Sequence, residues 1–208
     1  MLQIDPSPER GRLGFKDSVL ASFTFLDDLG FRPVQEKVTF VRYESPTVFV
    51  NIYHGRASFE LGVEIGSLSE PCESVTLYDI VSWAGALDVE GFGQHVMFQV
   101  SSQEGVQKFV PRLASLVQRY GAPFLQGDYT AFTKVLEARS SAAADYEKQV
   151  RLQDLRRRAE AAWDVKDFAT VVDLYGSMRP DMTAVEVKRL DYAEKGGWPR
   201  SRGAIQPR

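Results

Sequence analysis

The residues best placed to do chemistry are two carboxylates, Glu60 and Glu64, in a segment of alternating polar and apolar residues. Such alternation predicts a strand, so both side chains would project from one face, together with Asn51 of the preceding strand. At ~3.3 Å per residue the two carboxylates stand roughly 13 Å apart, beyond the separation that paired acid and base groups use on a glycosidic bond. Arg42, on a neighbouring strand, would neutralise part of their charge. We therefore interpret the pair as polar groups of a sheet face.

Metal-ligating and nucleophilic residue types are sparse, with two histidines, His54 and His95, and one cysteine, Cys72. No His-x-x-x-His or Cys-x-x-Cys spacing gathers them, so the sequence predicts no zinc site and no other cofactor. Cys72 follows a proline and has no flanking basic residue to activate it, which favours a spectator thiol. His54 lies beside a predicted turn, where a half-exposed polar residue is ordinary.

A β-meander is expected to position the sheet face. Residues 54–57 separate two alternating runs, and glycine at the first loop position is typical of a type II′ turn. With Gly55-Arg56 as a two-residue loop, the apolar residues pair as Ile52 with Phe59, Val50 with Leu61, and Val48 with Val63. A further strand is expected over residues 37–44, turning back through Ser45-Pro46.

The opposite face of this meander carries aromatic, charged and amide side chains. Asn51 and Glu60 fall directly opposite each other in the predicted register. Aromatic residues and arginine are what the cores of protein interfaces favour. We therefore predict that a partner binds this face through Phe40, Arg42, Phe49, Asn51, Tyr53, Glu60 and Glu64.

Helices are expected on both sides of the meander in the sequence. An amphipathic helix over residues 15–29 ends at Gly30, and a short helix over 76–84 begins with a capping box of Thr76 and Asp79. A strand over 94–100 and a helix over 106–120 follow, and Pro111 must kink that helix or start a new one. The predicted fold class is therefore α+β, an antiparallel β-meander packed by helices and followed by a C-terminal helical segment.

The chain from residue 128 onward has a helical pattern. Asp128 caps a first helix, residues 140–144 form a weak joint, and a charged helix then leads to Trp163. After a turn at 165–167 and a helix that ends at Pro180, Thr183 caps a last helix with Val187, Leu190 and Ala193 on its inner face. We therefore predict an α+β domain over 1–127, a helical domain over 128–195 and a flexible tail over 196–208.

Bulk composition bears on compartment and partner. One cysteine excludes an intrachain disulfide, no secretory signal pattern opens the chain, and no apolar run approaches the ~20 residues that span a bilayer. The expected location is the cytoplasm, with no membrane association.

The net charge of −3 hides an asymmetry between the two halves of the chain. Residues 1–127 carry 10 basic and 15 acidic side chains, whereas residues 128–208 carry 15 basic and 13 acidic ones. A net of −5 on the front half argues against nucleic acid as its ligand, because phosphate repels such a surface. A basic protein partner suits it better, although a balance of this size is also common on inert surfaces.

The segment Ala162-Trp163…Asp167-Phe168…Val171-Val172…Leu174-Tyr175…Pro180 resembles one helical hairpin of the tetratricopeptide type. The usual glycine before the turn is replaced by Val165. A single hairpin cannot bury its own face, so the resemblance implies a cap on the preceding helices rather than a repeat array.

The order of elements as a whole resembles small bacterial proteins of the immunity or accessory type found beside toxin genes. The elements that carry this resemblance are the first helix, the meander over 42–65, the helix that begins Leu77-Tyr78-Asp79, and the segment from Leu116 to Asp128. The resemblance implies a protein that binds and neutralises one partner without catalysis.

The leading hypothesis is therefore a non-enzymatic, immunity- or antitoxin-like protein that docks a protein partner. The first alternative is a structural or scaffold subunit of a larger phage or secretion assembly, which would use the C-terminal helices. The second alternative is an enzyme with a site between the sheet and the loop over 87–93. The sequence leaves the partner and the oligomeric state open.

Overall fold

The computed structural model describes residues 8–55, 58–69, 73–91 and 99–196. The chain divides into two compact units, Met1–Ser140 and Ser141–Arg208. The division falls within helix α7 (Tyr129–Asp164), which is unbroken, so the joint predicted at 140–144 does not interrupt the helix. The division also lies later than residue 127, because Phe132 and Val135 at the start of α7 belong to the core of the first unit. Most of residues 94–100, the predicted last strand, and all of the tail beyond Gly196 lie outside the described residues.

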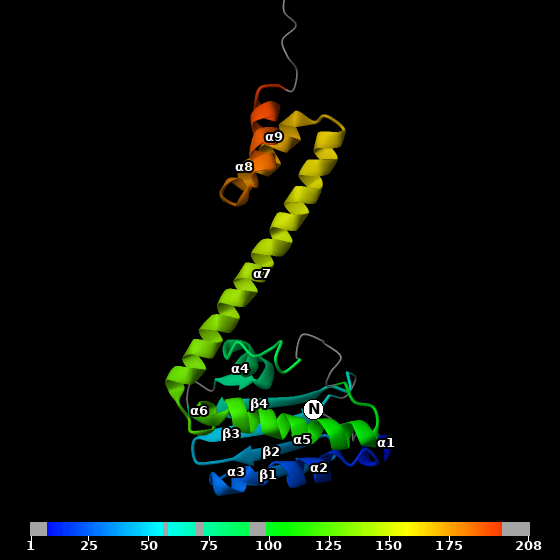
Figure 1. Cartoon of the computed structure of the whole chain (residues 1–208), viewed down its shortest axis with the longest axis vertical. Coiled ribbons are helices and arrows are strands. Elements are labelled where there is room, and N and C mark those ends of the chain that lie inside the picture. The colour runs from blue at the N-terminus through cyan, green and yellow to red at the C-terminus, as the bar shows by residue number, and fades with distance from the viewer. Residues whose placement is uncertain (1–7, 56–57, 70–72, 92–98, 197–208) are drawn as a thin grey trace, which may run out of the picture. The chain divides into compact units, whose positions relative to one another are not determined.

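The first unit is α+β, as predicted, and contains a five-stranded antiparallel sheet in the order β1-β2-β3-β4-β5 (Figure 1). Its strands are β1 (Arg32–Lys37), β2 (Phe40–Glu44), β3 (Val48–His54), β4 (Leu61–Ser67) and β5 (Ser74–Thr76). The strand predicted over 37–44 corresponds to β2, and β1 was not predicted; a turn at Val38-Thr39 folds β1 back against β2. Pro33 is tolerated in β1 because this is an edge strand, where a missing N–H donor leaves no ladder bond unmade.

The predicted register between β3 and β4 is wrong. Val50 lies opposite Ile65, Ile52 opposite Val63, and His54 opposite Leu61. β3 ends at His54 and β4 begins at Leu61, and a distant segment holds the residues before β4, with the Val100 N–H donating to the Phe59 carbonyl at 2.7 Å. The predicted and observed registers differ by an even number of residues, so the apolar face of each strand was predicted correctly.

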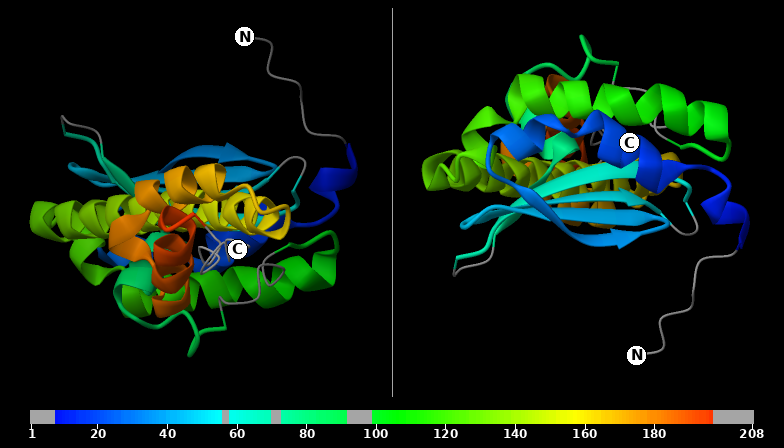
Figure 2. Two further views of the ribbon diagram at one scale, coloured as in Figure 1. Left: turned by 90° about the horizontal axis from the view of Figure 1, so that it is seen from above. Right: turned by 90° about the horizontal axis from the view of Figure 1, so that it is seen from below.

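Helices of the first unit cover one face of the sheet, as the views of α2 and α5 in Figure 2 show. They are α1 (Pro8–Gly11), α2 (Phe15–Ser22), α3 (Phe25–Asp28), α4 (Leu77–Trp83), α5 (Gln103–Tyr120) and α6 (Ala122–Leu125). Their apolar side chains, among them Phe15, Val106, Val110 and Phe124, form one core with Val50, Ile52, Val63 and Ile65 of the sheet. This core fixes which sheet face points away from the helices.

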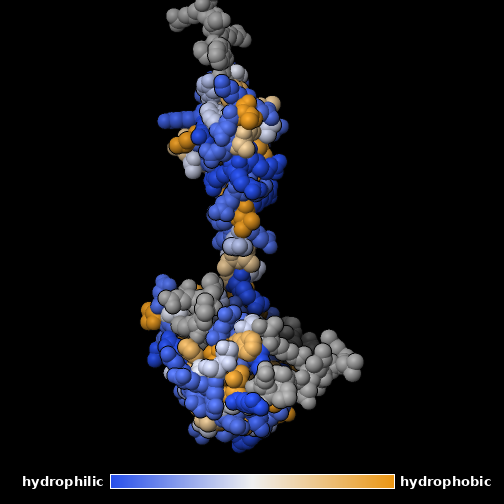
Figure 3. Space-filling view, turned by 90° about the vertical axis from the view of Figure 1, so that its right-hand side faces the viewer, coloured by the Kyte–Doolittle hydropathy of each residue, from blue (hydrophilic) through white to orange (hydrophobic). Residues whose placement is uncertain are grey.

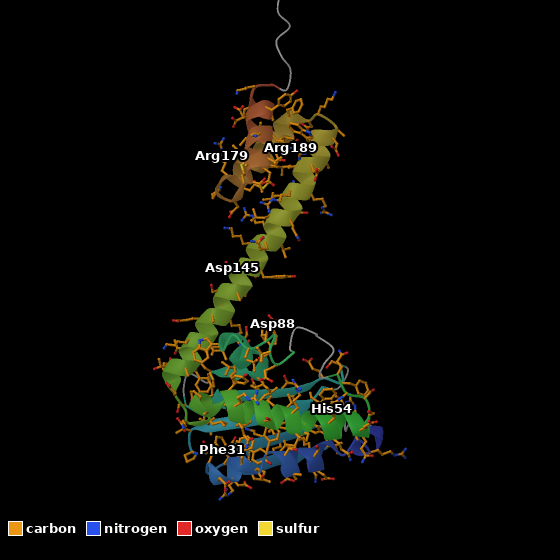
Figure 4. All side chains as sticks on the ribbon, viewed as in Figure 1. Phe31, His54, Asp88, Asp145, Arg179 and Arg189 are labelled. Carbon is orange, nitrogen blue, oxygen red and sulfur yellow. The ribbon has the colours of Figure 1, made fainter. Side chains whose placement is uncertain are left out.

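Local end signals were predicted better than helix lengths. The helix predicted over 15–29 is interrupted between α2 and α3, but its end is as expected, with Gly30 at φ 83° and the N–H of buried Phe31 (Figure 4) bonded to the Leu26 carbonyl. Thr76 and Asp79 form the predicted capping box of α4. Helix α5 continues through Pro111 as one element.

The second unit packs the end of α7 against α8 (Phe168–Ser177), the short 3₁₀ helix η1 (Arg179–Asp181) and α9 (Ala184–Glu194). Lys166, at φ 59°, makes the tight turn after α7, and Asp167 caps α8. Thr183 caps α9 as predicted, and Leu190 and Ala193 are buried. Val187 is 52% exposed, so its predicted inward position is wrong. Instead, the carboxylate of Glu186 accepts a 2.7 Å bond from Nε of Arg156 and takes the inner place.

Hydrophilic residues predominate on the side of this second unit seen in Figure 3, with separate hydrophobic spots between them. Within the ranges that the structure describes, no helix has the length and apolar character needed to cross a membrane.

Candidate functional site

The sheet face that points away from the core carries a chain of polar contacts across four strands. Arg42 donates from Nε to Oε1 of Glu44 at 2.7 Å and from Nη1 to Oδ1 of Asn51 at 3.2 Å. Asn51 donates from Nδ2 to Oε2 of Glu64 at 2.8 Å, and the hydroxyl of Ser74 donates to Oε1 of Glu64 at 2.6 Å. We call these five residues the polar ladder. Since each member is held by its neighbours, the ladder fixes the side chains of β2, β3, β4 and β5 relative to one another.

Along β3 and β4, an aromatic ring lies over a glycine on each side of the Asn51–Glu64 contact of the ladder. A Cβ added to Gly66 would overlap the ring of Phe49, and one added to Gly62 would overlap the ring of Tyr53. Both rings come from β3 and cross to β4, so glycine is required where they rest on its backbone. We call these two pairs the Phe49–Gly66 unit and the Tyr53–Gly62 unit.

The Phe49–Gly66 unit is closed on its outer side. The guanidinium of Arg42 lies 4.1 Å from the centroid of the Phe49 ring, and Phe49 is only 5% exposed. A cation stacked on a ring in this way is attracted by the negative potential of the ring face. Arg42 therefore joins the ladder to the aromatic ring.

The Tyr53–Gly62 unit is more open, since Tyr53 is half-buried. Phe40, the last aromatic residue of the predicted set, lies directly opposite Tyr53 on β2. Burial raises the pKa of the Tyr53 hydroxyl, and the carboxylates of Glu60, Glu64 and Asp79 raise it further. Tyr53 is therefore neutral near pH 7 and surrounded by negative charge.

The structure brings five of the seven predicted site residues into one connected surface, namely Arg42, Phe49, Asn51, Tyr53 and Glu64, with Phe40 beside Tyr53. Glu60 is the exception to the predicted pairing, because Glu64, and not Glu60, lies opposite Asn51. Glu60 is exposed, precedes β4 and bridges to Gln99. Asn51 is only 8% exposed, so it holds its neighbours in place through hydrogen bonds and offers little surface to a partner.

The sequence reasoning missed four members of this surface: Glu44, Gly62, Gly66 and Ser74. The two glycines did carry a signal, since glycine inside a strand often marks the close approach of another group. Glu44 and Ser74 could be assigned only once the strand partners and their register were known.

His54, the next residue after Tyr53, points to the other side of the sheet and is 2% exposed rather than half-exposed as expected (Figure 4). Its Nε2 lies 2.7 Å from the carbonyl of Val100, and its ring stacks on Phe15 at 5.7 Å. Nη1 of Arg10, itself 7% exposed, lies 3.2 Å from Nδ1 and 3.3 Å from Nε2. Burial lowers the pKa of His54, and the nearby positive charge of Arg10 lowers it further, although the bond to Val100 acts in the opposite direction. A neutral His54 thus ties α1 and the segment before α5 to the end of β3.

The loop between α4 and the undescribed residues is held by α5. Glu90 accepts bonds from the Tyr120 hydroxyl and from Arg119, and Arg112 donates to its backbone carbonyl at 2.8 Å. The bond from Tyr120, together with Arg119, lowers the pKa of the Glu90 carboxyl. An ionised, fully bonded carboxylate in this position anchors the loop and is a poor proton donor.

Among the residues that the structure describes, no three His, Cys, Asp or Glu side chains converge as metal ligands. Comparisons with protein-family models, with curated proteins and with solved structures found no match to this chain.

Proposed function

We propose that this chain is a non-enzymatic protein-binding protein of the immunity or antitoxin kind, acting in the cytoplasm and docking one protein partner on the sheet face. The observation that carries the proposal is the connected surface of the polar ladder and its two aromatic units. Aromatic rings and arginine dominate binding energy at interfaces, and a surface held by its own hydrogen bonds loses little entropy on binding.

Charge and the sheet edges support the same proposal. The ladder contains one cation and two carboxylates, and exposed Glu60 adds another negative charge at the Tyr53 end. Both sheet edges resist pairing with other strands, since β1 carries Pro33, Lys37 and a bulge, and β5 is only three residues long. A partner would therefore meet side chains on the face rather than add a strand.

Site-specific photocrosslinking tests this proposal in the cells from which the sequence comes. One variant of the chain carries a crosslinking amino acid at position 40, in place of Phe40 on the sheet face. A second variant carries it at position 129, in place of Tyr129, an exposed aromatic residue at the start of α7. We expect one protein to be captured from position 40 and not from position 129.

The double variant Arg42→Ala, Tyr53→Ala should abolish that capture. Its matched control is Arg179→Ala, Tyr192→Ala, which removes the same residue types from the second unit. Circular dichroism must show that both variants are folded. Capture that survives in the folded Arg42, Tyr53 variant would show that the partner does not bind this face.

The alternative function, a scaffold subunit using the C-terminal helices, is favoured by one cluster in the second unit. The rings of Trp163, Phe168 and Tyr192 lie 5.6–5.7 Å apart in all three pairings, and Arg189 lies 5.2 Å from the Trp163 ring. Tyr192 is exposed, so part of this cluster faces solvent. If the cluster drives assembly, light scattering should show an oligomer of the full chain that Tyr192→Ala converts to monomer. A monomeric full chain would exclude self-assembly through this cluster.

A further inference from the structure

The Phe49–Gly66 and Tyr53–Gly62 units are two copies of one arrangement on the same sheet face. Each has an aromatic ring of β3 resting on a glycine of β4. The glycines are four residues apart, so the rings project from the same face, with Asn51 and Glu64 between them. The group that covers the Phe49 ring therefore indicates which kind of group would bind on the Tyr53 ring.

The first copy contains its own cation. The Arg42 guanidinium stacks on the Phe49 ring at 4.1 Å and pairs with the Glu44 carboxylate at 2.7 Å. The Phe49 end of the face therefore combines an aromatic ring, a planar cation stacked on it, and a carboxylate that orients the cation. Guanidinium is suited to this arrangement because it is flat and donates through a rigid fork while its face stays on the ring.

The second copy has the ring and the carboxylates, but no cation of the described residues stacks on Tyr53. Glu60 and Glu64 lie two residues before and two residues after Gly62, which places them on the same face as the ring. Within the described residues, Glu64 accepts bonds from the neutral donors Asn51 and Ser74, and neither Glu60 nor Glu64 forms an ion pair there. Asp79, the third nearby carboxylate, is already paired with Arg139 at 3.3 Å.

We infer that Tyr53, with Glu60 and Glu64, is the docking position for an arginine side chain of a basic protein partner. The guanidinium stacks on the Tyr53 ring and pairs with Glu60, as Arg42 stacks on Phe49 and pairs with Glu44. This inference rests on the proposed function, and it adds the chemistry of the partner residue that anchors the complex.

The surroundings of Tyr53 favour one side for the approach of this arginine. Lys37 lies on β1 opposite Phe40, and with Phe40 and Tyr53 it lines a pocket of about 350 Å³. Its positive charge repels a second cation on that side. The ring rests on Gly62 of β4, so the guanidinium is expected over the outer face of the ring, near Glu60 and Glu64, whose charge is negative.

The experiment titrates the full chain, labelled with ¹⁵N, with the blocked peptide acetyl-Ala-Arg-Ala-amide. The same peptide with citrulline in place of arginine is the neutral control, because citrulline keeps the planar shape and loses the charge. We expect saturable shifts of the Gly62 and Glu60 amide signals with the arginine peptide and none with the citrulline peptide. Shifts of equal size with both peptides would overturn the inference.

Two variants identify the groups that bind. Tyr53→Leu keeps an apolar cover on Gly62 but removes the ring, and should weaken binding about 2- to 5-fold, the equivalent of an exposed cation–π contact. Glu60→Gln should weaken it about 1.5- to 5-fold, as expected for an exposed ion pair. The matched controls Tyr129→Leu and Glu104→Gln, at exposed positions elsewhere on the first unit, should leave binding unchanged. Equal effects from the controls would also overturn the inference.

The outcomes separate this inference from the proposed function. If position 40 captures a partner while the arginine peptide causes no shift at Gly62, the face binds protein but arginine is not its anchor. If the peptide binds at Tyr53 while no partner is captured from position 40, the arginine site stands and the proposed docking function fails.

Discussion

The two ends of one sheet face use the same arrangement in different ways. At the Phe49 end the ring is nearly buried, and Arg42 of the same chain covers it. At the Tyr53 end the ring is half-buried, no cation of the described residues stacks on it, and Glu60 and Glu64 beside it form no ion pair with those residues. The comparison teaches that an aromatic ring on a glycine can stabilise a sheet or offer a binding position, depending on whether a cation of the chain covers it.

The largest expected effect on stability comes from removing each ring in turn. Phe49→Ala should lower the free energy of unfolding by about 3 kcal/mol, since it removes a nearly buried phenylalanine and the stacking partner of Arg42. Tyr53→Ala should cost about half as much, because the ring is half-exposed and carries no cation. Urea denaturation followed by circular dichroism measures both values. Equal losses at the two positions would show that the two ends do not differ in stability.

Substituting the glycines under the two rings should also destabilise the protein more at the Phe49 end than at the Tyr53 end, but by a smaller amount than removing the rings. A Cβ on Gly66 would overlap the Phe49 ring and lie 2.9 Å from the backbone carbonyl of Glu73, which cannot move away easily. At Gly62 the three nearest atoms all belong to the Tyr53 ring, which can swing outward. We expect Gly66→Ala to cost about 2 kcal/mol and Gly62→Ala about 1 kcal/mol, as for overpacked sites.

A double variant tests whether the ring is the cause at Gly62. In the Tyr53→Ala protein, the added methyl group has no ring to displace, so Gly62→Ala should then cost almost nothing. A cost that persists without the ring would mean that the backbone, and not Tyr53, requires glycine there.

The sequence predicted most of what depends on near neighbours. The capping box at Thr76, the N-cap at Thr183 and the glycine C-cap at Gly30 involve residues within a few positions of one another, and all three are present. The apolar faces of β3 and β4 also follow from local alternation, and they were correct although the register was wrong.

The errors at the candidate site come from contacts between distant residues. β3 ends at His54 and β4 begins only at Leu61, where Val100 donates to the Phe59 carbonyl and Gln99 forms a β-bridge with Glu60, and nothing in the local sequence signals that partner. The correct register then puts Glu64 opposite Asn51, which moves Glu60 out of the ladder. His54 was misjudged for the same reason, since its burial depends on Arg10 and Phe15 from the first helices.

The smallest effect near neutral pH concerns His54, which holds the Tyr53 end of β3 to α1. Burial keeps the pKa of His54 below its ordinary value in the folded protein, so the unfolded chain binds a proton more readily. The stability contributed by neutral His54 is therefore complete above the unfolded pKa of about 6.5 and is lost progressively as the pH falls below it. Protonation would also place a second cation within contact distance of Arg10.

Urea denaturation from about pH 7.5 to 5.5 should show a loss of stability that is smaller in His54→Gln, whose side chain does not titrate in this range. The amide of Gly62 should report that loss earlier than that of Gly66 in hydrogen exchange at about pH 5.5, because only the Tyr53 end of the sheet face adjoins His54. An identical pH dependence in the wild type and His54→Gln would mean that other groups govern the acid response and that the two ends of the face do not differ in it.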